Sequence, residues 1–197
     1  MTLVRADGLG HRYRRGEEEV AALRDVDLAV GPAETVAVLG PSGSGKSTLL
    51  ALLAGLLRPT DGRLEVLGTD LGTATGRQVQ QLRAGGLGVL LQEPGRNLLA
   101  HGTARDNLVL AQPGRPRRER RARGRALLEL VGLGGREAER AGDLSGGEQQ
   151  AGARAVVDLL RAVRDREGTT VVAVTHDPAV AAALDRTVVL RDGRVVA

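Results

Sequence analysis

Apolar and polar residues alternate along residues 3–30 of the chain. Val26, Leu28 and Val30, for example, lie at every second position. This period of two is typical of half-buried antiparallel strands. Residues 35–40, which read TVAVLG, form instead a continuous apolar run that ends in glycine, and such a run favours a strand buried on both faces. The pattern therefore predicts an antiparallel layer followed by a buried strand.

Three further segments continue the succession of helices and strands. The stretch that follows the buried strand is helical in composition as far as Leu57 and stops before Pro59, which cannot continue a helix. Residues 60–68, TDGRLEVLG, predict an Asp-Gly turn and then a strand. Residues 87–95, LGVLLQEPG, predict a second buried strand that ends at Gln92.

The second half of the chain adds two helices and a hairpin. Residues 116–131 and 178–184 have helical patterns, and residues 186–197 predict a hairpin around an Asp-Gly turn. Strands near both ends, with helices between them, indicate an α/β fold. We see no internal repeat and no long linker, so we expect residues 1–197 to form a single domain.

The composition narrows the class of protein. The chain has no Cys, which excludes disulfides and thiolate metal sites and fits a reducing compartment. No apolar run approaches the length needed to span a bilayer, so we expect a soluble, cytoplasmic protein whose membrane role would need partner chains. The net charge is +4, and the one dense basic run is Arg115–Arg125. That run has two interpretations, a solvated helix face or a docking surface for nucleic acid or anionic lipid. No aromatic residue interleaves it, which argues against base stacking, and no nucleic-acid partner is expected.

A glycine-rich loop follows the first buried strand. The sequence GPSGSGKS matches the phosphate-loop pattern G-x-x-x-x-G-K-[ST] and lies between a predicted strand and a predicted helix. Its glycines let backbone N–H groups turn toward a polyphosphate, its lysine reaches the outer phosphates, and its last serine ligates Mg²⁺. A plain surface loop would not place the chain's sole lysine here. The candidate ATP-binding residues are Gly40, Pro41, Ser42, Gly43, Ser44, Gly45, Lys46, Ser47 and Thr48.

A second glycine pair lies about a hundred residues further on, in the sequence LSGGE. Ser145 and Glu148 have the spacing of a capping box, which by itself only starts a helix. Gly146 and Gly147, however, each cost a helix about 1 kcal/mol relative to alanine. Glycines there are useful when a phosphate must approach the helix N-terminus closely.

Together these two motifs resemble the ATP-binding subunit of ABC transporters. The motifs are GPSGSGKST and LSGGEQQ in that order, and they are supported by Gln92 at a strand end, by His176 in VVAVTHD and by Tyr13. The segment from residue 87 to 110 is similar to the lipoprotein-release and macrolide-export branch. The resemblance implies a P-loop NTPase fold of the ABC type. Such a fold has a parallel core sheet, an N-terminal antiparallel layer and a small helical subdomain at about residues 95–150.

The resemblance also implies a head-to-tail dimer with the same or another ATP-binding subunit, working with transmembrane permease subunits at the inner face of the cell membrane. ATP would lie between the glycine-rich loop of one subunit and the second motif of the other, with Tyr13 stacked on adenine. Gln92 would sense Mg²⁺ and contact the membrane partner, and His176 would touch the terminal phosphate. The residues of the second motif are Ser145, Gly146, Gly147, Glu148 and Gln149.

One family element is missing from the sequence. The family has a hydrophobic strand ending in Asp-Glu soon after LSGGE, and no apolar run of this chain ends in that pair. Compared with the family pattern, a segment is missing between Gln150 and Ala151. Typical lengths of a helix, a strand and their loops put the missing segment at about 30 residues. A degenerate gene, a deletion or assembly error, and a deliberate cut would each explain this.

Several expectations follow from the missing element. Hydrolysis should be impaired while ATP binding persists, and residues 146–167 could run as one helix. The alternatives are a non-hydrolysing nucleotide-binding partner or regulator, a chromosome or repair ATPase, which would need long heptad segments that are absent here, and an ordinary P-loop kinase, which would leave LSGGE unexplained.

Overall fold

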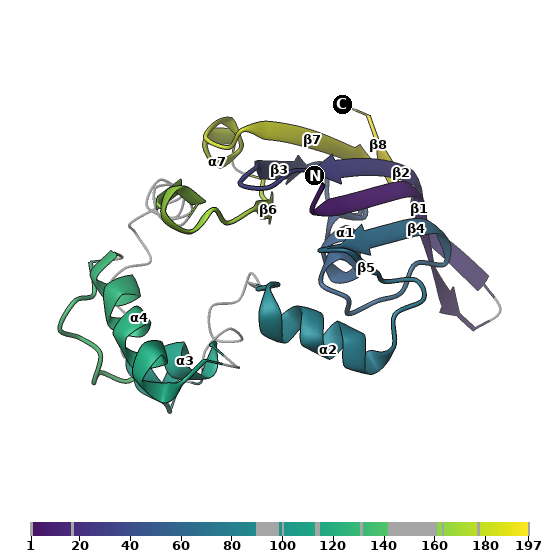
Figure 1. The fold of residues 1–197 in the computed structure, drawn as a ribbon. Helices are drawn as coiled ribbons and strands as arrows, with labels where there is room; N and C mark the ends of the chain where they lie inside the picture. Colours follow the sequence, from purple (N-terminus) through teal and green to yellow (C-terminus); the bar gives the residue numbers. More distant parts are fainter. Residues whose placement is uncertain are drawn as a thin grey trace. The chain divides into compact units, whose positions relative to one another are not determined.

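The computed structural model describes most of the chain in two compact units (Figure 1). The first unit consists of Met1–Arg83 and Leu160–Ala197, and the second of Ala84–Leu159. The single-domain organisation with a helical subdomain at about residues 95–150 stays a prediction. The described residues are 2–16, 18–89, 99, 101–112, 115–130, 132–141, 161–162, 164–176 and 178–196.

The N-terminal residues form the predicted antiparallel layer. It contains β1 (Val4–Arg15), β2 (Glu18–Val30), β4 (Asp61–Val66) and β5 (Thr69–Asp70), in the order β2-β1-β4-β5. All neighbouring strands in it are antiparallel. The three residues that set the sequence pattern on β2 are buried, while the residues between them are exposed, so period-two burial holds in this layer.

A second sheet carries the buried strand of the first unit. It contains β3 (Thr35–Leu39), β6 (Val171–Val174), β7 (Arg186–Arg191) and β8 (Arg194–Val195), in the order β6-β3-β7-β8. Strand β3 runs parallel to β6 and to β7, and β7 pairs antiparallel with β8. The predicted α/β class, parallel core and C-terminal hairpin are confirmed.

The first long helix is shorter than the sequence predicts. Helix α1 spans Lys46–Leu53 rather than extending to Leu57. Gly55 has a φ of 62° and its N–H donates to Leu52 O, while the N–H of Leu56 donates to Ala51 O. This pair of hydrogen bonds around a left-handed glycine is a Schellman motif, which ends a helix.

The predicted Asp-Gly turn before β4 is wrong. Asp61 and Gly62 both lie within β4, opposite an irregular stretch of β1. Gly62 has a φ of 72°, and a Cβ on it would lie 2.1 Å from the carbonyl oxygen of Gly8. Glycine is therefore needed here because two strands approach each other closely. An Asp-Gly pair also has a high propensity for turns, so the sequence alone cannot tell the two cases apart.

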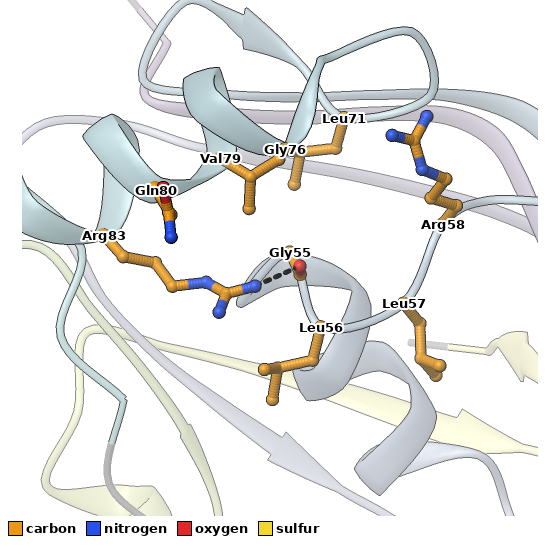
Figure 2. Close-up of a pocket in the computed structure, with 9 residues that line it drawn as sticks. All are labelled: Gly55, Leu56, Leu57, Arg58, Leu71, Gly76, Val79, Gln80 and Arg83. Carbon is orange, nitrogen blue, oxygen red and sulfur yellow. Dashed lines mark hydrogen bonds between the residues drawn. The ribbon is translucent and has the colours of Figure 1, made fainter.

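Helix α2 (Gly76–Gly85) was not predicted, because it begins and ends in glycine and buries one residue, Leu82. Its Arg83 donates from a terminal nitrogen to Gly55 O (Figure 2). The Nε atom of Arg83 donates to Ala54 O, so the side chain satisfies two carbonyls just after α1. A cavity of about 490 Å³ lies between these segments and the residues after α1, and it contains no part of the glycine-rich loop.

Helix α7 (Pro178–Ala182) confirms the helix predicted at residues 178–184, and it packs against β3 and β7. In the second unit, α4 (Arg117–Leu130) confirms the helix predicted at residues 116–131. The unpredicted α3 (Ala104–Leu110) begins at a capping box formed by Thr103 and Asp106.

Part of the basic run lies on the exposed surface of α4, at Arg117, Arg118 and Arg121, and both interpretations of the run stay open. No helix among the described residues is long and apolar enough to cross a membrane.

The second buried strand, predicted within residues 87–95 and ending at Gln92, is wrong in its described part. Residues 87–89 form no strand, and Val89 is 41% exposed. A short apolar run fixes neither the pairing nor the burial of a strand. Residues 90–92 lie outside the described residues. The continuous helix predicted over residues 146–167 is described only in its last part, where residues 161–162 and 164–167 are helical, and the rest of it stays a prediction.

Asp185 joins the beginning of β3 to the beginning of β7. Its Oδ2 accepts 2.8 Å hydrogen bonds from the backbone N–H and the hydroxyl of Thr35, and Arg164 donates to its Oδ1 at 2.9 Å. The hydrogen bonds from Thr35, followed by the charge of Arg164, lower the pKa of Asp185. A carboxyl whose pKa is lower in the folded than in the unfolded chain stabilises the fold above its unfolded pKa. That contribution is lost as the pH falls through the folded value.

We expect Asp185→Asn to lower the free energy of unfolding by about 1 kcal/mol at neutral pH, since hydrogen bonds to a charged group contribute more but the side chain is 45% exposed. Urea unfolding at neutral pH and at a pH below the carboxyl pKa measures this, and the difference from the parent should shrink in acid. Asp165→Asn is the matched control, because Asp165 contacts the same Arg164 and is 63% exposed. An equal loss for both variants would contradict the role of Thr35.

Candidate functional site

The glycine-rich loop connects β3 to α1, and two of its glycines are required by packing. Gly40 has a φ of 149°, and a Cβ on it would lie 2.0 Å from the backbone oxygen of Leu190. Gly45 has a φ of 102°, and its Cβ would lie 2.5 Å from the backbone oxygen of Ala22. The loop is therefore pressed between β7 and β2 at positions where a side chain does not fit.

The outer side of the loop is open. Gly43 has a φ of 78°, and nothing lies within 4 Å of the position its Cβ would take. Gly45 is the N-cap residue of α1, and no side chain caps this helix end. The first N–H groups of a helix point along its axis and carry a partial positive charge, so this end of α1 favours an anion.

Lys46 lies over the same loop. Its Nζ donates to the carbonyl oxygens of Gly40 at 2.8 Å and Pro41 at 2.6 Å, and it lies 3.4 Å from the hydroxyl of Ser44. The loop thus fixes the place of the ammonium next to the N-terminus of α1. Ser47, the next residue, is exposed.

The C-terminal hairpin supports the loop from behind. The N–H of Gly193 donates to Ser44 O at 3.1 Å, and Gly193 O accepts from Arg24 N at 2.7 Å. A Cβ on Gly193 would lie 2.8 Å from Ala22 O. The sequence indicated this Asp-Gly turn, but its contact with the loop joins residues about 150 positions apart and leaves no local signal.

Tyr13 reaches α1 from β1. Its hydroxyl forms a 3.2 Å hydrogen bond with Oγ1 of Thr48, which is buried, while Tyr13 itself is 41% exposed. The structure therefore brings Tyr13 to the helix that begins in the glycine-rich loop. Sequence reasoning missed His11, whose ring lies 4.7 Å from that of Tyr13.

His176 lies at the same sheet edge as the loop. Strands β3 and β6 are parallel, Val38 pairs with Val174, and Thr175 N donates to Val38 O at 3.3 Å. The residue after Thr175 therefore leaves the sheet beside the residue at which the loop begins. The His176 side chain is exposed.

The other candidate residues lie outside the described part of the chain. They are Gln92, Ser145, Gly146, Gly147, Glu148 and Gln149. Within the described residues, no group of three His, Asp or Glu side chains is placed to hold a metal ion.

A buried parallel strand, a glycine-rich loop that carries one lysine, and an uncapped helix N-terminus define a P-loop nucleotide-binding protein. The sequence model of the ABC transporter family matches residues 23–163. The chain belongs to this family, whose members bind ATP with Mg²⁺ and hydrolyse it.

Several similar curated proteins are macrolide exporters. The chain is 39% identical over 217 residues to the macrolide export ATP-binding/permease protein MacB of Chromobacterium violaceum, covering 96% of this chain and 33% of that protein. It is 39% identical over 222 residues to MacB 1/2 of Paracoccus denitrificans, covering 99% and 33%. The chain spans about a third of the length of these relatives, so it corresponds to one part of such a protein.

Solved structures share the fold. The ATP-binding cassette MJ0796, in a dimeric post-hydrolysis state with ADP and Pi, matches with a TM-score of 0.83 at 29% identity, covering 98% of this chain and 97% of that chain. CbiO1 of Clostridium perfringens matches with a TM-score of 0.85 at 20% identity, covering 100% and 87%, and this likeness concerns the fold alone. The predicted ABC-type P-loop fold is confirmed.

Proposed function

We propose that this chain is the ATP-binding part of a macrolide-export type ABC transporter, coupling ATP to export through transmembrane permease segments at the inner face of the membrane. The observation that carries the proposal is Lys46 held above the open glycine-rich loop by the carbonyls of Gly40 and Pro41. An ammonium next to a helix N-terminus recognises the charge of a triphosphate. The similar proteins are named as macrolide exporters, which supports export as the direction of transport.

In this proposal, four of the described residues each contact a different part of the Mg-ATP complex. Lys46 contacts the outer phosphates, the hydroxyl of Ser47 holds Mg²⁺, and Tyr13 stacks on adenine. His176, at the edge where β6 ends, approaches the terminal phosphate. When bound, Mg²⁺ supplies positive charge to the phosphate oxygens, and the loop amides supply fixed dipoles that need no reorganisation.

The remaining parts of the site come from segments outside the described residues and from a second subunit. Gln92 would contact Mg²⁺ and the membrane partner. Ser145 to Gln149 would close over ATP bound to a partner subunit. The similarity to a cassette known as a dimer supports this assembly, and the partner would be either the same chain or another ATP-binding subunit.

We further propose that this form of the protein binds ATP but hydrolyses it poorly. No apolar run of the chain ends in the Asp-Glu pair that would hold Mg²⁺ and polarise the attacking water. The alignments with the macrolide exporters extend over 217 and 222 residues, whereas the chain has 197. Each relative therefore has residues that are aligned with gaps in this chain. Both observations support a missing segment.

The exposure of β6 supports the same interpretation. Its neighbour β3 is buried at four of its five residues, whereas all four residues of β6 are half-buried although they read VVAV. A parallel strand that reads as a continuous apolar run is ordinarily buried on both faces. A strand missing next to β6 would leave such a strand partly exposed.

The experiment is phosphate release from Mg-ATP by the purified chain. We expect turnover about 10²- to 10⁴-fold below that of a variant carrying an exporter's acidic strand segment inserted between Gln150 and Ala151, because that is the usual contribution of a general base. Lys46→Ala in the inserted variant is the control for contaminating ATPases. Equal and measurable turnover with and without the insert would contradict the proposal. ATP binding with no turnover in either form would favour a non-hydrolysing partner or regulator.

A further inference from the structure

His11 is a buried polar residue for which the proposed function has no role. It is 7% exposed, although it lies on β1 two residues from the half-exposed Tyr13. Its Nδ1 lies 2.9 Å from the carbonyl oxygen of Arg58, in the segment between α1 and β4. A carbonyl oxygen can only accept, so Nδ1 carries the hydrogen and the ring orientation is fixed.

The ring of His11 meets the ring of Tyr13 edge to face. The two centroids lie 4.7 Å apart and the planes are inclined by 82°. In such a pair the positive edge of one ring faces the negative face of the other, which is a preferred aromatic arrangement. At least one face of the Tyr13 ring remains free of His11, and the tyrosine keeps 41% of its surface exposed.

Tyr13 is therefore held at two points. His11 contacts its ring, and Oγ1 of the buried Thr48 forms a hydrogen bond with its hydroxyl. The segment that anchors His11 is itself tied to β1, because Thr60 N donates to Gly10 O at 3.0 Å. An exposed aromatic ring ordinarily samples several rotamers, and holding it in one orientation lowers the entropy cost of stacking a ligand on it.

We propose that His11 is a positioning residue that presents the Tyr13 ring to the base of the nucleotide. This inference rests on the proposed function of the loop as an ATP site. It assigns to His11 an effect on recognition of the base and no effect on recognition of the phosphates.

The test separates base from phosphate by titrating Mg-ATP and Mg-tripolyphosphate in a calorimeter. We expect His11→Ala to weaken ATP binding about threefold to tenfold, the range of one aromatic contact, and to leave tripolyphosphate binding unchanged. His11→Phe keeps the ring and His11→Asn keeps a donor near the place of Nδ1, so each should recover part of the loss. His101→Ala, which removes an exposed histidine of the second unit, should bind both ligands like the parent.

A spectroscopic measurement reports on Tyr13 directly. Tyr13 is the only tyrosine and the chain has no tryptophan, so its fluorescence has a single source. We expect His11→Ala to lower the fluorescence anisotropy and to increase quenching by acrylamide without nucleotide, with His11→Phe close to the parent. A variant that merely weakens the fold would lose affinity for both ligands.

The outcomes distinguish this inference from the proposed function. If the parent binds ATP in a manner that depends on Lys46, and His11→Ala binds ATP equally well with unchanged anisotropy, the role of His11 is overturned and the site stands. Equal loss of ATP and tripolyphosphate binding also overturns it, because His11 would then support the loop as a whole. If the parent does not bind ATP, the proposed function fails and the role of His11 fails with it.

Discussion

Replacing Lys46 by alanine is expected to weaken ATP binding about a hundredfold, because a charge-assisted contact contributes up to about 3 kcal/mol. The Nζ atom donates to two carbonyls of the glycine-rich loop, and these carbonyls can accept from water in the variant. The fold should therefore survive. Lys46→Arg should also bind poorly, since the planar guanidinium does not replace a compact ammonium in a tight loop. Calorimetric titration with Mg-ATP measures both variants.

Arg83→Ala is the matched control for the loss of a cation. Arg83 also donates to two backbone carbonyls, those of Ala54 and Gly55, but these lie after the last turn of α1 and outside the loop. Its removal should leave ATP affinity unchanged. If Arg83→Ala weakened binding as much as Lys46→Ala, the effect would be one of overall charge, and the specific role of the loop would be contradicted.

Gly40→Ala should destabilise the protein by about 3 kcal/mol or more. A Cβ at this position would lie 2.0 Å from the backbone oxygen of Leu190, and backbone atoms of a strand cannot move aside cheaply. The chemical denaturation midpoint and the soluble yield measure this loss. The effect should appear without any nucleotide.

Gly68→Ala is the control that separates the effect of a steric clash on stability from the effect of backbone strain. Gly68 has a φ of 75° and nothing within 4 Å of its Cβ position, so alanine there bears about 1–2 kcal/mol of left-handed strain. We expect Gly40→Ala to be clearly the less stable of the two variants. Equal stabilities would mean that the loop is not pressed against β7.

Local sequence patterns predicted the parts of the site that are continuous in the sequence. The strand β3, the glycine-rich loop and the start of α1 follow one another in sequence, and one lysine marks the point where they meet. The Asp-Gly pair at the C-terminal hairpin was read correctly, whereas the same pair at the start of β4 was not. The difference is that Gly62 faces a neighbouring strand, which propensity does not record.

Contacts between distant segments could not be predicted. Ser44 and Gly193, which share a hydrogen bond, lie about 150 positions apart, and His11 lies 47 positions from Arg58, so neither contact leaves a local signal in the sequence. The resemblance to ABC transporters indicated a role for Tyr13 but not what holds it. The end of α1 was misplaced because a helix can stop at a glycine as well as at a proline.

Hydrogen–deuterium exchange of the loop amides tests the central claim most directly. The claim is that backbone N–H groups at residues 42–48 bind the triphosphate of ATP. Saturating Mg-ATP should slow exchange across this segment, Mg-AMP should not, and peptides from α4 should exchange equally in all conditions. If ATP bound to the chain while exchange at residues 42–48 stayed unchanged, the triphosphate would lie elsewhere and the account would be wrong.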